Sequence, residues 1–287
     1  MNDLKKRVLE QLHVMDASPK KSLGQNFLID DNVINKIIQA VVKRKPKNLI
    51  EVGPGLGALT RHLVALEKPL TLIELDDEFS AYWQKQSEFP SSSNLDVIVE
   101  DALRLNWQEL VERETLLVSN LPYQISSSLV MDRSFGPSFI DQMVLMFQKE
   151  VAERITSDVS KKSFGLLTVI SQVFWEVGLV CDAGPGSFYP APKVSSRVLY
   201  FKRKSLQGEL EIFNDAKVAQ SFLKFVKAAF LHRRKFLLKN LKPVMNENKS
   251  LSDVEDVFNS MDINLKARAE EVYPMEYVEL FKSISLV

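Results

Sequence analysis

The tetrapeptide Asn120-Leu121-Pro122-Tyr123 holds the residues of this sequence that are best suited to chemistry. It follows the apolar run 115–119, which predicts a strand, so these residues would lie at a strand end. The Asn120 side chain and the Leu121 carbonyl can accept hydrogen bonds, while Pro122 stiffens the backbone and Tyr123 offers a ring for stacking. This platform suits a planar base with an exocyclic amine. An ordinary turn is the alternative interpretation.

A glycine loop, Glu51-Val52-Gly53-Pro54-Gly55-Leu56-Gly57, precedes this platform in the chain. It follows a predicted strand and opens a predicted helix, where the backbone must approach a ligand without interference from Cβ atoms. The spacing is G-x-G-x-G, which differs from the G-x-G-x-x-G of dinucleotide-binding proteins. The loop therefore predicts a nucleotide-like cofactor at Gly53 and Gly55, with a purely structural turn as the alternative.

Two acids stand at the ends of the next two predicted strands. Glu74 follows Gly53 by about 20 residues, a position from which a carboxylate can accept both hydroxyls of a ribose. Asp101 can accept a hydrogen bond from the amine of an adenine, and the backbone N–H of Ala102 can donate one to a ring nitrogen. A helix cap is the alternative for each acid. With the platform at 120–123, these residues indicate a methyltransferase that acts on an adenine nitrogen.

A nicotinamide dehydrogenase is the competing interpretation of the glycines and Glu74. It leaves the platform at 120–123 unexplained and lacks an evident proton-transfer residue, because His13, His62 and His232 fall in a terminal helix, the glycine-loop helix and a basic run. No cluster of His, Cys and carboxylate residues has metal-ligand spacing, so the sequence predicts no metal.

Apolar strands alternate with helices over the first two-thirds of the chain. This alternation predicts an α/β domain with a parallel sheet covered on both faces. The expected strands are 48–52, 70–75, 95–100, 116–119 and 143–147, followed by 175–180 and 198–201. The expected helices begin near Asp31 and span 59–66, 77–86, 150–155 and 164–174.

Beyond the charged stretch 202–208, which reads as a linker, the pattern becomes helical over 219–230, 233–241 and 251–261. We therefore expect a catalytic domain over 1–204, which carries the glycine loop and the platform, and a small helical domain over 205–287. Residues 1–18 are expected to be flexible or to form a helix that contacts RNA.

Composition is that of an ordinary globular chain of 287 residues with zero net charge. A single cysteine, Cys181, and the absence of a long apolar run favour a cytoplasmic protein. Although net charge argues against a nucleic-acid partner, residues 216–246 contain no acid and eight Lys or Arg residues. Such a local patch suits phosphate contact, with a solvated helix face as the alternative.

Taken in order along the chain, these motifs resemble the small-subunit ribosomal RNA adenine N6-dimethyltransferases of the KsgA/RsmA type. The resemblance runs from about Lys20 to Tyr277. Its motifs are 21–28 (KSLGQNFL), 51–57, 73–76 (IELD), 101–102, 120–123, 148–154 (QKEVAER), 188–196 (FYPAPKVSS), 232–235 (HRRK) and 268–270 (RAE). Two residues depart from the family's pattern: Gln124, where relatives usually carry Asn, and Tyr189, where a small polar residue is usual.

The resemblance implies a Rossmann-like class I methyltransferase domain that uses S-adenosylmethionine. The implied cofactor contacts are Gln25, Asn26, Leu28, Gly53, Gly55, Glu74, Asp101, Ala102 and Asn120. The base would meet Asn120, Leu121 and Pro122, and it would be sandwiched between Tyr123 and Phe188, for which core packing is the alternative. Ribosomal RNA would be held by Lys20, Lys21, Lys193, Arg233, Arg234, Lys235 and Lys239.

The implied reaction is dimethylation of two adjacent adenosines near the 3′ end of small-subunit RNA within an immature 30S particle, by a monomer. Two alternatives stay open. One is the related large-subunit (23S) adenine methyltransferase of the macrolide-resistance type. Its helical domain is usually shorter, so the long C-terminal tail here favours the small-subunit type. The other is a non-catalytic assembly factor that binds nucleic acid, against which the intact acids and platform argue.

Overall fold

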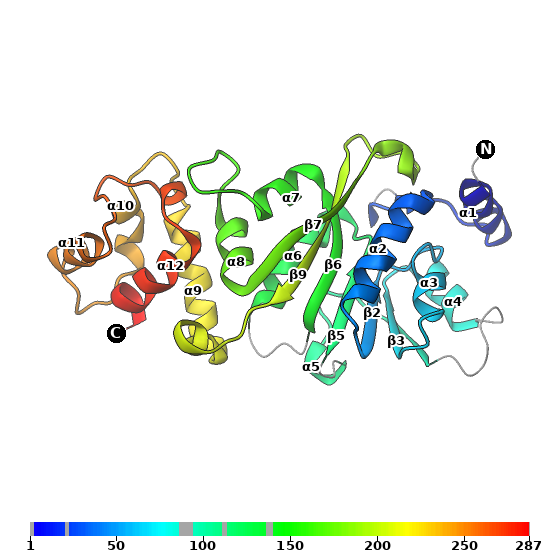
Figure 1. Cartoon of the computed structure of the whole chain (residues 1–287), viewed down its shortest axis with the longest axis horizontal. Helices are drawn as coiled ribbons and strands as arrows, with labels where there is room; N and C mark the ends of the chain where they lie inside the picture. The colour runs from blue at the N-terminus through cyan, green and yellow to red at the C-terminus, as the bar shows by residue number, and fades with distance from the viewer. Residues whose placement is uncertain (1–2, 21–22, 86–93, 111–113, 136–139, 287) are drawn as a thin grey trace. The chain divides into compact units, whose positions relative to one another are not determined.

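The computed structural model describes residues 3–20, 23–85, 94–110, 114–135 and 140–286. Its contacts divide the chain into two compact units (Figure 1). The first comprises 1–132, 138–152 and 177–203, and the second comprises 133–137, 153–176 and 204–287. The cut after Arg203 lies one residue from the expected boundary. Residues 153–176, however, group with the C-terminal helices rather than with the catalytic domain to which the sequence assigned them.

A seven-stranded sheet has the order β4-β3-β2-β5-β6-β9-β7. The strands are β2 (Asn48–Val52), β3 (Leu70–Glu74), β4 (Leu95–Val99), β5 (Thr115–Ser119), β6 (Ile140–Gln148), β7 (Trp175–Ala183) and β9 (Ser196–Arg203). The first five run parallel, and β9 is antiparallel to β6. After β2 the chain builds β3 and β4 on one side and then returns to place β5 on the other. Such a switch of direction leaves a crevice at the carboxyl ends of β2 and β5.

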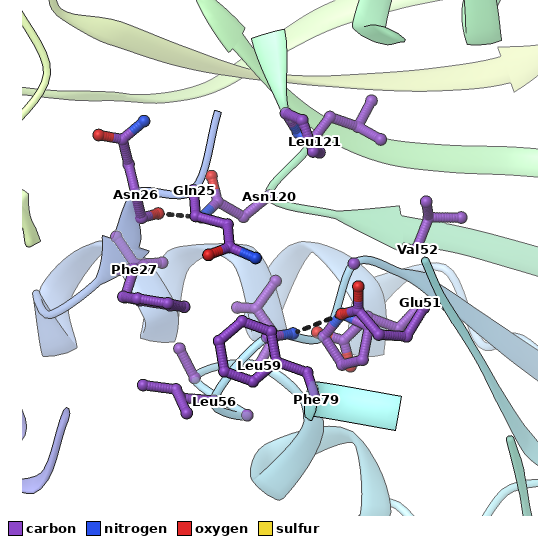
Figure 2. Close-up of a pocket in the computed structure, with 18 of the residues that line it drawn as sticks. Gln25, Asn26, Phe27, Glu51, Val52, Leu56, Leu59, Phe79, Asn120 and Leu121 are labelled. Atoms are coloured by element: carbon purple, nitrogen blue, oxygen red, sulfur yellow. Dashed lines mark hydrogen bonds between the residues drawn. The ribbon is translucent and has the colours of Figure 1, made fainter. Parts of the chain in front are cut away.

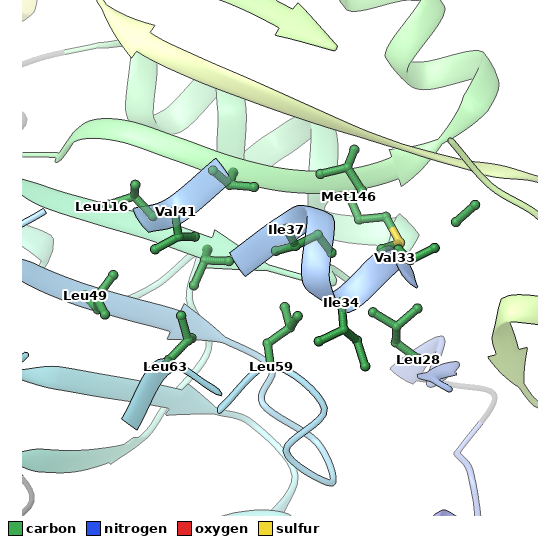
Figure 3. Close-up of a cluster of buried hydrophobic side chains, with 14 of the residues drawn as sticks. Leu28, Val33, Ile34, Ile37, Val41, Leu49, Leu59, Leu63, Leu116 and Met146 are labelled. Atoms are coloured by element: carbon green, nitrogen blue, oxygen red, sulfur yellow. The ribbon is translucent and has the colours of Figure 1, made fainter. Parts of the chain in front are cut away.

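The helix α2 (Asp31–Lys43) packs on this sheet through one apolar stripe (Figure 3). Its buried residues recur at helical spacing, and they pack in one cluster with strand residues such as Leu49 and Leu116: Val33, Ile34, Ile37 and Val41. Asp30 caps the helix by accepting from two backbone N–H groups. Between the strands lie α3 (Thr60–Val64), α4 (Asp77–Lys85), α5 (Trp107–Leu110), α6 (Tyr123–Ser134) and α7 (Lys149–Ile155).

The N-terminal helix α1 (Asp3–Val14) packs on a second, smaller apolar cluster. Val8 and Leu12 bury themselves there with Phe27, Leu56 and Phe79. Nearby, the short strands β1 (Phe27–Leu28) and β8 (Phe188–Tyr189) form an antiparallel pair, preceded by the 3₁₀ turn η2 (Pro185–Ser187). The expected choice between a flexible N-terminus and a helix is thus decided in favour of a helix over 3–14.

The second unit is helical around a core of phenylalanines. Phe213, Phe222 and Phe281 contact one another, and Phe174 and Phe225 extend the group. Its elements are α8 (Leu166–Phe174), η3 (Gly208–Asn214), α9 (Ala216–Ala229), α10 (Leu237–Leu241), η4 (Lys242–Val244), α11 (Leu251–Ser260), η5 (Ala269–Glu271), α12 (Pro274–Phe281) and the π-helical η6 (Lys282–Leu286). Among the described helices, none is long and apolar enough to cross a membrane.

The expected strands and most expected helices are confirmed to within a few residues. Two local predictions are wrong, and one helix was not predicted. The helix expected over 233–241 begins at Leu237, because residues 231–235 form a turn. The linker was expected from residue 202, but it begins two residues later, because β9 extends to Arg203. The helix α6 was not predicted, because its sequence YQISSSLVMDRS lacks an amphipathic stripe.

Candidate active site

A cavity of about 460 Å³ lies in the first unit, in the crevice where β2, β3 and β5 end. Its wall includes every residue that the sequence assigned to the cofactor, together with the whole platform at 120–123. Figure 2 shows Gln25, Asn26 and Asn120 on one side of this space and Phe27, Leu56 and Phe79 on another. Segments distant in sequence thus form one cofactor-sized pocket with polar and apolar walls.

The glycine loop follows β2 with a backbone that only glycine adopts easily. Gly53, Gly55 and Gly57 have φ values of +66°, +51° and +82°. A Cβ on Gly57 would lie 2.6 Å from the ring of Trp83, whose Nε1 donates to the Gly55 carbonyl at 2.9 Å. The Trp83 ring therefore supports the loop from behind and holds the backbone of Gly53 and Gly55 against the cavity.

Glu74 ends β3 beside this loop and is 7% exposed. One oxygen accepts from Gly55 N–H at 3.3 Å, and the other accepts from Leu75 and Asp76 N–H at 2.9 and 3.0 Å. Burial raises the pKa of Glu74, although these backbone donors oppose that shift. Each carboxylate oxygen has two lone pairs, so the oxygen that accepts only from Gly55 N–H can accept one further hydrogen bond, such as one from a ligand's hydroxyl.

Glu51 is a second buried acid on the cavity wall, to which the sequence analysis assigned no role. It is 2% exposed and accepts from the Thr60 hydroxyl at 2.7 Å. Burial, aided by the negative charge of Glu74, raises the pKa of Glu51 to about 8. The side chain is therefore mostly protonated at neutral pH. Its position at the start of the glycine loop was the available signal, but the sequence does not show that it is buried.

Asp101 and Ala102 follow β4 and line the cavity. One Asp101 oxygen accepts from Leu103 N–H at 2.9 Å, and the other lies 3.7 Å from the Arg104 guanidinium. Asp101 therefore caps its own turn, as the alternative interpretation expected, while it also lines the pocket. These two positions are compatible with the proposed contact to an adenine ring.

Asn120 lies directly after β5 with a defined side-chain orientation. Its Nδ2 donates to the backbone carbonyl of Asn26 at 3.1 Å, the bond drawn in Figure 2. With the amide nitrogen so occupied, Oδ1 has no hydrogen-bond partner among the described residues. The strand end below is fixed by Ser119, whose hydroxyl donates to the carbonyl of Val52 on β2. The result is a positioned acceptor at the cavity.

Tyr123 lines the cavity, whereas Phe188 does not. The Tyr123 hydroxyl bonds the buried Ser196 hydroxyl at 2.7 Å, which fixes the ring, and burial raises the pKa of the phenol. Phe188 is 3% exposed and packs in the main apolar cluster, where it pairs with Leu28. The Phe188 ring thus packs in the core, as the alternative interpretation had it, and does not line the cavity, whereas the sandwich of a bound base stays a prediction.

The segment before β1 is hydrogen-bonded to the turn after β3. Asp76, which is 2% exposed, accepts from Lys20 Nζ at 2.9 Å and from Gln25 Nε2 at 2.8 Å. Lys20 Nζ also lies 3.3 Å from Glu78. The expected RNA contact by Lys20 therefore competes with two ion pairs within the protein, and Lys21 lies outside the described residues.

The basic residues of the second unit differ in their surroundings. Arg233 donates to the carbonyls of Lys162 and Phe164, each at 3.0 Å, and lies 4.0 Å from Glu270. It stabilises its own unit, which makes it a poor choice for a phosphate contact. The Arg233 side chain is nevertheless 43% exposed, and four further predicted RNA-binding residues are exposed as well: Lys193 in the first unit, and Arg234, Lys235 and Lys239 in the second.

The family described as "Ribosomal RNA adenine dimethylase" matches residues 17–285. The chain belongs to this family. It is 45% identical over 285 residues to the ribosomal RNA small subunit methyltransferase A of Bdellovibrio bacteriovorus, covering 98% of each chain. The protein of that name from Natranaerobius thermophilus is 34% identical, with 97% of this chain and 96% of the relative covered.

Solved structures agree on the fold of this adenine dimethylase. A dimethyladenosine transferase from Plasmodium falciparum matches with a TM-score of 0.71 at 24% identity, over 89% of this chain and 96% of that one. The 23S rRNA methyltransferase ErmE matches with a TM-score of 0.65 at 24% identity, over 90% and 99%. The expected class I methyltransferase fold with a helical C-terminal part is confirmed.

S-adenosylmethionine is the methyl donor of this family, and the cavity fits it. The open glycine backbone at 53–55 allows close approach, Glu74 presents an acceptor for a ribose hydroxyl, and the apolar side chains of Leu56 and Phe79 form part of the wall. The helix α1 adds Arg7, Val8 and Gln11 to this wall. The sequence did not assign these residues to the site, and the family match begins only after them.

Proposed function

We propose that this enzyme dimethylates the N6 amines of two adjacent adenosines near the 3′ end of small-subunit ribosomal RNA, during maturation of the 30S particle. The observation that carries the proposal is the oriented amide of Asn120 on the wall of the cofactor cavity. The name shared by relatives that cover nearly the whole chain supports the small subunit as the source of the RNA.

The target amine needs help because its lone pair is delocalised into the adenine ring. Asn120 Oδ1 and the Leu121 carbonyl would accept its two hydrogens, and bonds in these directions favour a tetrahedral nitrogen with a localised lone pair. Bound S-adenosylmethionine supplies an electrophilic methyl group with a good leaving group. The protein contributes positioning and fixed dipoles, and no general base is required before methyl transfer, because the nitrogen becomes cationic on attack and then loses its proton to water while the neutral sulfur leaves.

Base binding would rest on Tyr123. A stacked aromatic contact is worth roughly 1–3 kcal/mol, which is comparable to the cost of unstacking one base. Phe188 would act indirectly, because it packs behind Leu28, which lines the cavity. Moving Phe188 into a stacking position would require opening the core.

RNA would be held mainly through exposed basic residues outside the cavity. Arg234, Lys235 and Lys239 would contact phosphates from the second unit, and Lys193 would do so from the first. We further propose that the enzyme acts on an assembled particle, since its zero net charge provides no general attraction to bare RNA. A cytoplasmic monomer is also part of the proposal, and the single cysteine suits a reducing compartment.

The second candidate is methylation of large-subunit RNA, and the fold similarity to ErmE over 99% of that chain is the observation that favours it. Methyl transfer from labelled S-adenosylmethionine to undermethylated small subunits and to large-subunit RNA, followed by nucleoside mass spectrometry, separates the two. We expect N6,N6-dimethyladenosine in the small-subunit sample alone. Product only in large-subunit RNA would establish the second candidate. RNA binding without product in either sample would indicate an assembly factor.

A further inference from the structure

A continuous path of bonds links the turn after β3 to Asn120. The Asp76 carboxylate accepts from Gln25 Nε2 at 2.8 Å, and the next residue, Asn26, uses its backbone carbonyl to accept from Asn120 Nδ2 at 3.1 Å. Asp76 itself lies two residues after Glu74 and donates its backbone N–H to that carboxylate at 3.0 Å. The turn that contains Glu74, the acid expected to bind a ribose, is thus linked by hydrogen bonds to Asn120, whose amide is proposed to bind the target amine.

Gln25 is well placed to transmit position because both ends of its amide are occupied. Its Nε2 donates to Asp76, and its Oε1 accepts from the backbone N–H of Lys20 at 2.8 Å. A second bond restrains the neighbouring backbone, since Asn26 Nδ2 donates to the Gly24 carbonyl at 2.9 Å. The side chain of Gln25 therefore fixes the backbone at 25–26 more directly than it offers groups to a ligand.

Asp76 has no exposed side-chain surface and stays charged. Burial by itself would raise its pKa, but the hydrogen bonds from Lys20, Gln25 and Glu78 N–H, together with the positive charge of Lys20, hold the pKa of Asp76 below its ordinary value. The geometry around a buried carboxylate with charge-assisted hydrogen bonds is fixed, because losing any of these bonds leaves a buried charge without compensation and costs free energy. Asp76 also accepts from Glu78 N–H at 3.1 Å, which orients it at the start of α4.

We propose that Asp76 is a positioning residue for methyl transfer, which acts through Gln25 and the Asn26 carbonyl to orient the Asn120 amide. The inference rests on the acceptor role proposed above for Asn120. Fixing Asn120 Nδ2 on Asn26 is what turns Oδ1 toward the amine. If the 25–26 backbone shifts, the amide can rotate or exchange its two ends, and an N–H would then face the amine that needs an acceptor.

The test compares Asp76→Asn with Glu78→Gln in the full-length enzyme. Each substitution removes one negative charge beside Lys20, but only Asp76 contacts Gln25. Asn keeps the size and helix-capping ability of Asp, so the fold should survive. Gln25→Met provides a second route, because it removes the donor while keeping a side chain of similar length.

At saturating cofactor and undermethylated small subunits, we expect Asp76→Asn and Gln25→Met to lower the single-turnover rate about tenfold or more, a size typical of misplaced catalytic groups. Glu78→Gln should stay close to wild type. In an Asn120→Ala background, Asp76→Asn should have no further effect on the rate, since the group it positions is absent.

Several outcomes would overturn the inference. A saturated rate for Asp76→Asn equal to that of wild type, with only weaker binding of S-adenosylhomocysteine, would make Asp76 a structural support of the cofactor pocket. A full additional loss in the Asn120→Ala background would show that Asp76 acts elsewhere. Absence of methyl transfer by the wild-type enzyme would instead refute the proposed function, so the two failures are distinguishable.

Discussion

At the scale of single residues, the site consists of groups whose orientation is fixed by neighbours. Asn120 is held by Asn26, Tyr123 by Ser196 and Glu74 by three backbone N–H groups. Such prior orientation matters for a reaction whose catalysis depends on positioning, because no reorganisation is needed when the amine arrives.

Replacement of Asn120 by Ala should therefore reduce the chemical step. We expect a single-turnover rate roughly 100-fold below wild type, the size of effect seen when one preorganised hydrogen-bonding group is removed. Asn259→Ala is the matched control, since Asn259 is an exposed amide on α11 and is not among the residues that line the cavity. Rapid-quench measurement at saturating cofactor checks this result. An unchanged rate for Asn120→Ala would remove Asn120 from the mechanism.

Glu51 makes the stability of the protein depend on pH. In the folded protein the carboxyl stays protonated up to about pH 8, whereas its ordinary pKa is 4.5. Between these values the unfolded chain binds fewer protons, so the free energy of unfolding falls as pH rises. Glu51→Gln removes this loss while keeping an acceptor for Thr60. The free energy of unfolding of the variant should exceed that of wild type, and this excess should be larger at pH 8 than at pH 5 by on the order of a few kcal/mol.

Urea unfolding of both proteins at pH 5 and pH 8 measures this difference. Glu247→Gln, at an exposed position, is the control and should behave as wild type at both values. A difference between Glu51→Gln and wild type that does not change with pH would show that Glu51 is ionised in the folded protein.

At the scale of elements, the site depends on turns that only certain residues can form. The loop between β2 and α3 needs positive φ at three glycines, and at Gly57 it also needs the space that the Trp83 ring leaves. The loop thus links a backbone requirement to the packing of α4, which carries Trp83.

Gly57→Ala tests this link. We expect a loss of about 1–3 kcal/mol in unfolding free energy, because the added methyl group meets Trp83 and the backbone is strained. Cofactor affinity should fall as well, since Trp83 Nε1 holds the Gly55 carbonyl. Gly186→Ala is the control, as a Cβ there would meet no atom within 4 Å. Thermal unfolding and isothermal titration with S-adenosylhomocysteine check both effects. Equal stability of the two variants would contradict the argument.

At the scale of the whole molecule, zero net charge coexists with a strongly basic segment. The acid-free stretch 216–246 lies within the second unit, and α9 in that stretch exposes Lys217, Lys224 and Lys227 at helical spacing. Charge separated in this way can bind one phosphate-rich surface without attracting nucleic acid generally.

RNA binding should therefore weaken steeply with salt. Replacing both Arg234 and Lys235 with Ala should lower the slope of log affinity against log salt by about 1–2, because two phosphate contacts are lost. Replacing Lys43 and Lys45 with Ala removes the same charge, but these exposed residues are not among the predicted RNA-binding residues. That double variant should leave the slope unchanged. Binding titrations with small subunits at several salt concentrations decide this. Equal slopes for both double variants would move the RNA contact elsewhere.

The sequence alone determined the strands, the glycine loop, the acids at the strand ends and the 120–123 platform, whereas the parallel sheet it predicted did not include the antiparallel β9. Local rules decide these features: parallel strands read as apolar runs, and the residues just after them meet at one edge of the sheet. Tertiary structure alone decided that Phe188 is core, that Arg233 holds its own unit, and that Gln25 joins Asp76 to the Asn120 wall. Those outcomes depend on contacts between segments far apart in the chain, about which residue type and spacing carry no information.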